Sequence, residues 1–344
     1  MITESGLGRH AMVSNRLKAL SASDIASALR QELPPHQVEV AVAMMDKVSK
    51  ELDHLMQLAT REFRERGSIN LGWGGSQSFD AAAIKVGPRH DYLITITVGA
   101  PLILLAMAHE IWTMSTGAPP EGLSEEAILN GAMRTGEIGE QAQLVAKDAT
   151  LLLYFHELSH VLWSHCLLDW ELMPSQDRRA LEYQADFHAG LSFATWHIAG
   201  VVQPVESDWH AAAGRLVLAA LLLATALKAF SAQSDAYHFP TIRMLAFMAG
   251  GFQAIQQKSQ TLTTQAVFQD RAAEQNFIGP FIADYLERLK ATELRRLGGT
   301  EAEIRADIHQ LHAVTTPRLA QLSKDTGSLW NKLPDVAGDA DNSD

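Results

Sequence analysis

Cysteine is almost absent: Cys166 is the only one among 344 residues, so no disulfide can form within the chain. Disulfide frameworks are typical of small secreted domains, whereas a lone thiol suits a reducing cytoplasm. The N-terminal stretch "MITESGLGRHAMVSNRLKAL" also lacks the apolar core run that a secretory signal needs. We therefore predict a cytoplasmic protein.

Basic residues are scarce as well. Lys and Arg number 28 against 40 Asp and Glu, which gives a net charge of −12. A surface that follows nucleic-acid phosphates needs clustered Lys and Arg, so we expect no nucleic-acid partner. Part of the acidic excess lies in residues 331–344, which we expect to form a disordered acidic tail.

Uninterrupted apolar runs are short compared with the roughly twenty residues of a membrane span. The most apolar run, "LVLAALLLATAL" (216–227), is bounded by Arg215 and Lys228 and predicts a core helix. We expect no transmembrane span, while peripheral contact with a membrane stays open as an alternative. The sequence carries no signal for an oligomeric state.

What is present is typical of a folded globular protein, with 47% apolar and 20% charged residues. Apolar residues recur at three- and four-residue spacings from about 35 to 66, which predicts a long amphipathic helix. The glycine- and serine-rich stretch 67–78 is interpreted as a connector. Residues 80–87 and 92–99 alternate like strands, and the short "PRHD" between them predicts a hairpin.

Beyond the hairpin the pattern is almost entirely helical. Helices are expected at about 101–111, 146–167, 176–197 and 208–231, and more follow up to about residue 325. Thr300 and Glu303 have the spacing of a capping box. The sequence thus predicts a mainly α fold with a small β-sheet (α+β).

Three segments divide this expected fold. Residues 1–66 form an N-terminal helical segment, residues 67–330 the main domain with C-terminal helices, and residues 331–344 the tail. We expect them to make one compact unit.

The stretch "HELSH" (156–160) carries the strongest chemical signal. On a helix, positions four apart lie on the same face, so His156 and His160 can direct two imidazoles at one ion. Glu157 lies about 100° round the helix and can reach a water molecule at that ion. Two nitrogen ligands with a neighbouring carboxylate base are the physical content of the His-Glu-x-x-His zinc motif.

The stretch "EYQAD" (182–186) on the next predicted helix can complete such a site. A catalytic zinc ion needs a third protein ligand and an open position, and Glu182 can be that ligand. Asp186, one turn further on, can accept the spare N–H of a ligating histidine and fix its tautomer.

Two interpretations without catalysis remain. The histidines could be structural members of a buried helix, or the zinc could be structural rather than catalytic. "HEIWT" (109–113) has a His-Glu pair without a second ligand and is interpreted as incidental. His165 lies about 140° round a continuous helix from His160, outside its coordination sphere. His165, His188 and His197 are assigned to packing or to supporting contacts, and Cys166 is expected to be an inert thiol.

Together, "HELSHVLWSH" and "EYQAD" resemble the gluzincin metallopeptidases, whose thermolysin-like members carry a His-Glu-x-x-His helix followed by a Glu-x-x-x-Asp helix. The histidine at 165 and the upstream hairpin are more similar to the HtpX and CAAX-prenyl-protease group. Those enzymes have long membrane spans, which depart from this chain, and the soluble Lit-type phage-exclusion peptidases fit better. The matching motifs cover residues 79–186. The resemblance implies a zincin-like metallopeptidase core with additional helices.

Carried over by position, the resemblance implies the role of each motif residue: zinc ligands His156, His160 and Glu182, general base Glu157, and supporting carboxylate Asp186.

The segment "YHFPTIR" (237–243) resembles the downstream His-Pro…Arg segment of HtpX-like enzymes, although Phe239 separates the histidine from the proline. A hydrolytic site needs a donor for the developing oxyanion, and Tyr237, His238 or Arg243 could supply it. Alternatively, Arg243 pairs with an acidic residue and pins two helices together.

The resulting hypothesis is a zinc-dependent endopeptidase that acts on a protein or peptide substrate. Glu157 takes a proton from water at the metal and returns it to the leaving amine. The strand at 92–98 is expected to hold the substrate backbone by adding a strand to the sheet. The Lit-type resemblance implies phage defence by cleavage of a host protein. The alternatives are a catalytically silent zinc-binding sensor with a peptidase fold and a helical protein at a membrane surface.

Overall fold

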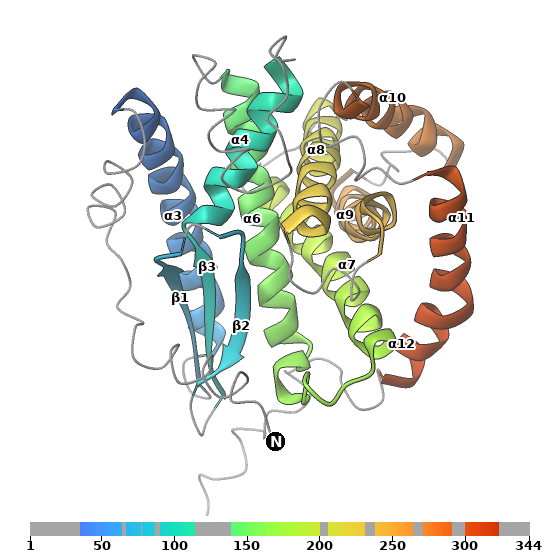
Figure 1. Cartoon of the computed structure of the whole chain (residues 1–344), viewed down its shortest axis with the longest axis horizontal. Helices are drawn as coiled ribbons and strands as arrows, with labels where there is room; N and C mark the ends of the chain where they lie inside the picture. The colour runs from blue at the N-terminus through green and yellow to red at the C-terminus, as the bar shows by residue number, and fades with distance from the viewer. Residues whose placement is uncertain are drawn as a thin grey trace, which may run out of the picture.

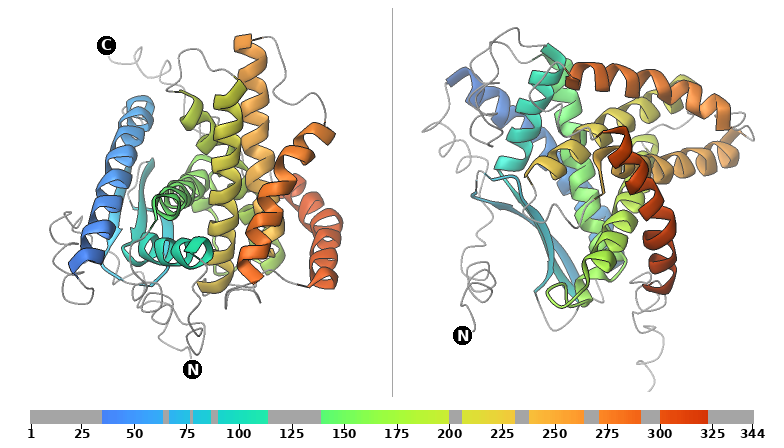
Figure 2. Two further views of the ribbon diagram at one scale, coloured as in Figure 1. Left: turned by 90° about the horizontal axis from the view of Figure 1, so that it is seen from above. Right: turned by 45° about the vertical axis from the view of Figure 1, so that its right-hand side comes forward.

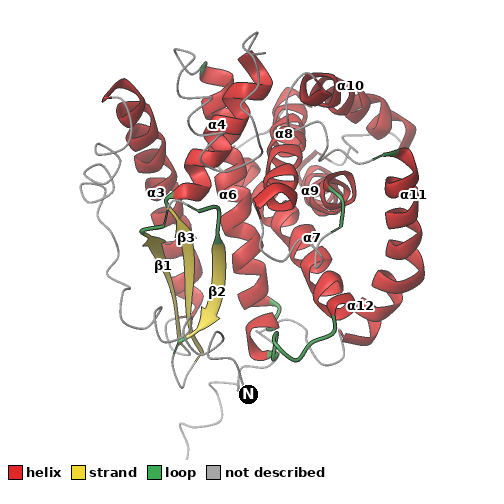
Figure 3. Ribbon diagram, viewed as in Figure 1, coloured by secondary structure: helices red, strands yellow, loops and turns green. Residues whose placement is uncertain are grey.

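The computed structural model describes residues 35–63, 67–76, 78–86, 90–113, 139–199, 206–230, 238–263, 271–290 and 300–322. Helices predominate in these ranges and accompany one small sheet, which confirms the predicted fold class (Figure 3). The helices are α3 (Pro35–Phe63), α4 (Gly99–Thr113), α6 (Glu140–Leu162), α7 (Ser175–Ala199), α8 (Glu206–Phe230), α9 (Pro240–Thr263), α10 (Arg271–Lys290), α11 (Glu301–Gln310) and α12 (Thr316–Leu322). A 3-10 turn, η1 (His165–Leu167), follows α6, and a π-helical turn, η4 (Leu311–Thr315), joins α11 to α12.

The sheet has three strands in the order β1-β3-β2. Strand β3 (His90–Thr97) lies in the middle, with β2 (Ala81–Lys85) antiparallel on one side and β1 (Gly67–Gly74) parallel on the other. The predicted hairpin between β2 and β3 is confirmed. The interpretation of residues 67–78 as a connector is wrong for 67–74, because Ile69 and Trp73 pack into the core while the backbone pairs with β3.

Helix α6 occupies the middle of the molecule (Figure 1). The sheet and α3 lie on one side of it, and α7, α8 and α9 lie on the other. Figure 2 shows the same arrangement from two further directions, with α10, α11 and α12 outermost on the helical side. Because both sides of α6 are covered, its residues from Thr150 to Val161 are all buried, including the polar residues of the His-Glu-x-x-His motif.

Helix α8 contributes a large share of the core. The stretch Trp209–Phe230 is long and apolar enough to cross a membrane by length and composition, and 72% of its most apolar window is buried inside the molecule. Leu216, Val217 and Leu222 are fully buried, which is the environment predicted for a core helix.

Two glycines allow α7 and α9 to approach closely. A Cβ atom added to Gly190 on α7 would lie 1.8 Å from the carbonyl oxygen of Phe247 on α9. The converse holds for Gly250 on α9, whose added Cβ would lie 1.8 Å from the carbonyl oxygen of Phe187. Only glycine fits at these two positions, because it has no Cβ atom. This contact brings the part of α7 that carries "EYQAD" against the N-terminal half of α9.

The predicted capping box is present at the start of α11, with Thr300 and Glu303 exchanging side-chain-to-backbone hydrogen bonds.

Candidate metal centre

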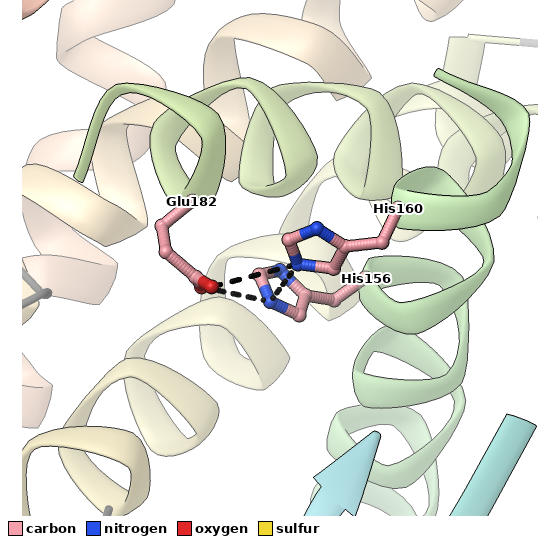
Figure 4. Close-up of side chains that lie close together, drawn as sticks. All are labelled: His156, His160 and Glu182. Carbon is pink, nitrogen blue, oxygen red and sulfur yellow. Dashed lines mark hydrogen bonds and ion pairs between the residues drawn. The ribbon is translucent and has the colours of Figure 1, made fainter. Parts of the chain in front are cut away.

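Three of the residues singled out from the sequence converge where α6 and α7 meet (Figure 4). His156 and His160 lie one turn apart on α6, and their Nε2 atoms are 3.2 Å apart. Glu182 reaches them from α7, with Oε2 at 3.1 Å from Nε2 of His156 and Oε1 at 3.6 Å from Nε2 of His160. All three side chains are buried, and the group could hold a metal ion.

The chemistry of the donor atoms fits a four-coordinate cation. In a tetrahedral site with bonds of about 2.0–2.1 Å, neighbouring ligand atoms are roughly 3.3 Å apart. The three separations of 3.1, 3.2 and 3.6 Å lie close to that value. Nδ1 of each histidine faces another partner, so the two Nε2 atoms are left directed at each other and at a carboxylate. A cation among them would give these closely spaced, buried donor atoms a common partner.

Asp186 lies one turn beyond Glu182 and supports the first ligand. Its Oδ1 is 2.9 Å from Nδ1 of His156. Arg243 on α9 holds the same carboxylate with two hydrogen bonds of 2.6 and 2.7 Å, and its Nη2 lies 3.7 Å from Oε2 of Glu182. The chain thus supplies a carboxylate that orients His156 and a guanidinium that orients the carboxylate.

Charges in the cluster move the pKa values of its acids and bases. Burial by itself lowers the pKa of His156, but hydrogen bonds to Asp186 and Glu182 outweigh burial and raise the pKa to about 10. Burial lowers the pKa of His160 well below its usual range. Burial raises the pKa of Glu182, but the nearby histidines and Arg243 reverse the effect, so its pKa falls below the ordinary value. The ligand carboxylate is therefore anionic at neutral pH.

Glu157 follows the first ligand on α6 and is 8% exposed. Its burial raises the pKa of its carboxyl to about 7, and the charges of Glu182 and Asp80 act in the same direction. His156 and Arg243 oppose this rise. A carboxyl with a pKa near 7 can both accept and return a proton at physiological pH.

His160 has a different supporting partner, which depends on where α6 ends. The helix stops at Leu162 instead of continuing to about 167, and Ser164 takes a left-handed φ of 64°. The chain then turns back, and Nδ1 of His165 lies 2.9 Å from Nδ1 of His160. His165 stays outside the group of ligand atoms, as predicted, but contacts a ligand that it could not reach from a continuous helix. Gln184 on α7 accepts at 3.0 Å from Nε2 of His165.

The three oxyanion candidates have different surroundings. Tyr237 lies outside the described residues. Both ring nitrogens of His238 are engaged by the C-terminal helices, with Nδ1 at 2.6 Å from Asp307 and Nε2 at 3.2 Å from Thr315. His238 therefore links the start of α9 to α11 and η4, and neither ring nitrogen is left to stabilise an oxyanion. Arg243 forms an ion pair with Asp186 that joins α9 to α7, which is the alternative role predicted from the sequence.

Three other histidines and the cysteine do not belong to the group of ligand atoms. Burial lowers the pKa values of His109, His188 and His197, and His188 stacks on Trp163 with ring centroids 3.9 Å apart. Burial raises the pKa of Cys166 to about 12, so the group is a thiol at neutral pH. Its Sγ donates to the carbonyl oxygen of Ala83 on β2 at 3.4 Å.

Gln184 is a member of the hydrogen-bonded surroundings that the sequence interpretation missed. It lies inside "EYQAD" with no motif of its own, and only the turn at Ser164 brings His165 within its reach.

Comparison of the chain with known protein families, with curated proteins and with solved structures finds no match. The function must therefore be inferred from the chemistry of the site.

Proposed function

We propose that the chain is a zinc-dependent endopeptidase. The proposal rests on one observation: two helices bring His156, His160 and Glu182 together in a buried group, and the buried carboxyl of Glu157 directly follows the first ligand on α6. Two imidazoles and one carboxylate form a donor set that suits zinc and leaves a fourth position open for water or substrate. A closed structural site uses four protein ligands and would give Glu157 no role.

The chemistry supplied by a bound zinc ion is activation of water and polarisation of the substrate carbonyl. Glu157 then takes the proton from the attacking water and returns it to the leaving amine. Asp186 keeps a proton on Nδ1 of His156, so that Nε2 remains a lone-pair donor. Burial of the cluster excludes bulk water and so strengthens each of these interactions.

The structure changes where the substrate backbone is expected to bind. Strand β3 has β1 on one side and β2 on the other, so the expectation that residues 92–98 add a substrate strand is wrong. Strand β2 is an edge strand in this sheet and contacts α6 and η1. We place the substrate on the outer edge of β2, the edge away from β3, where an extended peptide can pair by backbone hydrogen bonds.

The register identifies the backbone groups at that edge. Thr97 N–H donates to the carbonyl of Asp80, and Val86 N–H donates to the carbonyl of Asp91, so even-numbered residues of β2 face β3. Backbone groups alternate in direction along a strand, so those of Ala81 and Ala83 face away from the sheet. The Cys166 thiol on the carbonyl of Ala83 is a weak donor that a peptide N–H can replace.

Metal content and three substitutions test the proposal. The purified protein is expected to carry about one zinc ion per chain, and His156→Ala is expected to lose it. Glu157→Gln should keep the metal but abolish the new N-termini that the wild type generates in a proteome-wide cleavage assay. Glu110→Gln, in the incidental "HEIWT" segment, is the matched control and should cleave like the wild type. A zinc-loaded wild type that produces no cleavage would instead favour the silent sensor.

Two proline substitutions test the placement of the substrate. Ala83→Pro removes an N–H that faces away from β3, which an edge strand tolerates. We expect a higher KM or lower kcat with unchanged zinc content and little loss of stability. Ala82→Pro removes an N–H that faces β3 and should destabilise the sheet. If Ala83→Pro cleaves as well as the wild type, the substrate does not pair at this edge.

A further inference from the structure

The two histidines of the metal centre have chemically different supporting partners. Nδ1 of His156 faces the carboxylate of Asp186, whereas Nδ1 of His160 faces the imidazole ring of His165. His165 has no exposed surface and its second nitrogen lies 3.0 Å from Oε1 of Gln184. A continuous hydrogen-bonded chain therefore leads from His160 through His165 to Gln184.

The position of each proton in this chain follows from the donor and acceptor atoms. The amide oxygen of Gln184 can only accept, so Nε2 of His165 carries a proton. With its single proton on Nε2, His165 has a lone pair on Nδ1, which accepts from His160. Nδ1 of His160 is consequently protonated, and its Nε2 is left as the lone-pair donor that faces His156 and Glu182.

The backbone is shaped to make this contact. The left-handed conformation of Ser164 ends α6 and turns His165 back toward the site. The indole N–H of Trp170 donates to the carbonyl oxygen of His165 at 3.2 Å, and the Trp170 ring lies 5.4 Å from the ring of His160. A non-glycine residue with positive φ is uncommon, and it persists only where the surrounding contacts hold it.

We propose that His165 and Gln184 are positioning residues that select the metal-binding tautomer of His160. The proposal rests on the proposed metal site but not on its catalytic activity. It adds an asymmetry to that site: a carboxylate supports His156, while a neutral imidazole and amide support His160. The second arrangement fixes a tautomer without adding another negative charge beside the cation.

We call the hydrogen-bonded chain His160–His165–Gln184 the relay. It is tested by the affinity for zinc, measured by titrating the metal-free protein with Zn²⁺ against a chelator of known affinity. His165→Phe keeps the ring volume but removes both nitrogens, and we expect its Kd for zinc to rise about 10- to 100-fold. His165→Asn keeps an oxygen near the position of Nδ1 and should restore most of the affinity. Gln184→Met removes the acceptor and should weaken binding in the same direction.

Two controls separate positioning from a general loss of structure. His188→Ala removes a histidine of α7 that stacks on Trp163, and zinc should bind this variant as it binds the wild type. Unfolding of each metal-free variant is measured in urea, so that a change in affinity can be compared with a change in stability. The relay is refuted if His165→Phe folds and binds zinc within about threefold of the wild type, well below the 10-fold lower bound for such partners.

The tautomers themselves provide a readout that does not require metal. Long-range proton–nitrogen correlation spectra of the metal-free wild type should show His165 protonated at Nε2 only. With zinc added, His160 should be protonated at Nδ1. A His165 protonated at Nδ1 would overturn the relay even if zinc binds. If zinc does not bind at all, the metalloenzyme proposal is lost, and the metal-free spectrum still decides whether the relay exists.

Discussion

In Gly190→Ala, the added methyl group would lie where α7 crosses α9. Helix α7 carries Glu182 and Asp186, and helix α9 carries Arg243. The new Cβ would lie 1.8 Å from the carbonyl oxygen of Phe247, and real Cβ contacts are essentially never below 3.0 Å. The two backbones must therefore separate by more than about 1 Å, because a helix carbonyl cannot rotate away as a side chain can.

Helix propensity and packing act in opposite directions in Gly190→Ala, so the sign of the change is informative. Propensity alone favours alanine by about 1 kcal/mol in a helix interior. Overpacking costs about 1–3 kcal/mol or more, and separation of the helices also stretches the buried hydrogen bonds between Arg243 and Asp186. We expect a net loss of about 3 kcal/mol in the free energy of unfolding, together with weaker zinc binding.

The assay is urea denaturation of the metal-free protein, with Gly214→Ala as the matched control. A Cβ at Gly214, also inside a helix, meets only the tip of the Phe281 side chain, at 3.1 Å. That ring can shift, so the control should stay within about 1 kcal/mol of the wild type. If Gly190→Ala is as stable as the wild type, the close approach of α7 and α9 is not what positions the supporting residues.

Substitutions at three further positions test other parts of the structure. Ser164→Val should lose about 2 kcal/mol or more in urea denaturation, because a β-branched residue is strained at positive φ, whereas Ser164→Gly should stay within about 1 kcal/mol. Arg243→Met should destabilise the metal-free protein by about 3 kcal/mol, since it leaves the buried carboxylate of Asp186 without its cation, and a loss below about 1 kcal/mol would contradict this. Burial and then the charges of Arg215 and Lys147 lower the pKa of His197 to about 3, so unfolding takes up a proton below pH 6.5. Stability linked to His197 is therefore present above that pH and lost as the pH falls, and the metal-free wild type should lose about 1.5 kcal/mol relative to His197→Leu between pH 6.5 and 5.

The local part of the candidate site could be predicted because helical geometry is local. His156 and His160 share a face of α6 at any place in a fold, and Glu182 and Asp186 share a face of α7 for the same reason. Their convergence was also predictable, because a short connection between two buried helices favours antiparallel neighbours. Burial of the flanking residues required partners for the polar ones, and the cluster provides them.

The sheet was only half predicted, and the missed half changed the proposed substrate site. The β2–β3 hairpin is a local contact. Strand β1 instead pairs directly with β3 in parallel, although β2 lies between them in the sequence. Gly72 and Gly74 make the β1 sequence resemble a connector. The strand is stabilised by a partner that lies elsewhere in the chain, so periodicity alone could not identify it or show that β3 is central.

The sequence by itself determined the chemistry available to this protein: two imidazoles and two carboxylates at helical spacing, and a carboxyl next to the first imidazole. Tertiary structure decided how that chemistry is supported. The pair Arg243–Asp186 joins residues that are 57 positions apart, and the contact of His165 with His160 depends on a helix that ends without the glycine that usually marks such an end. Both depend on how whole helices pack and stop, which is set by the sum of many distant contacts and not by the spacing of any one motif.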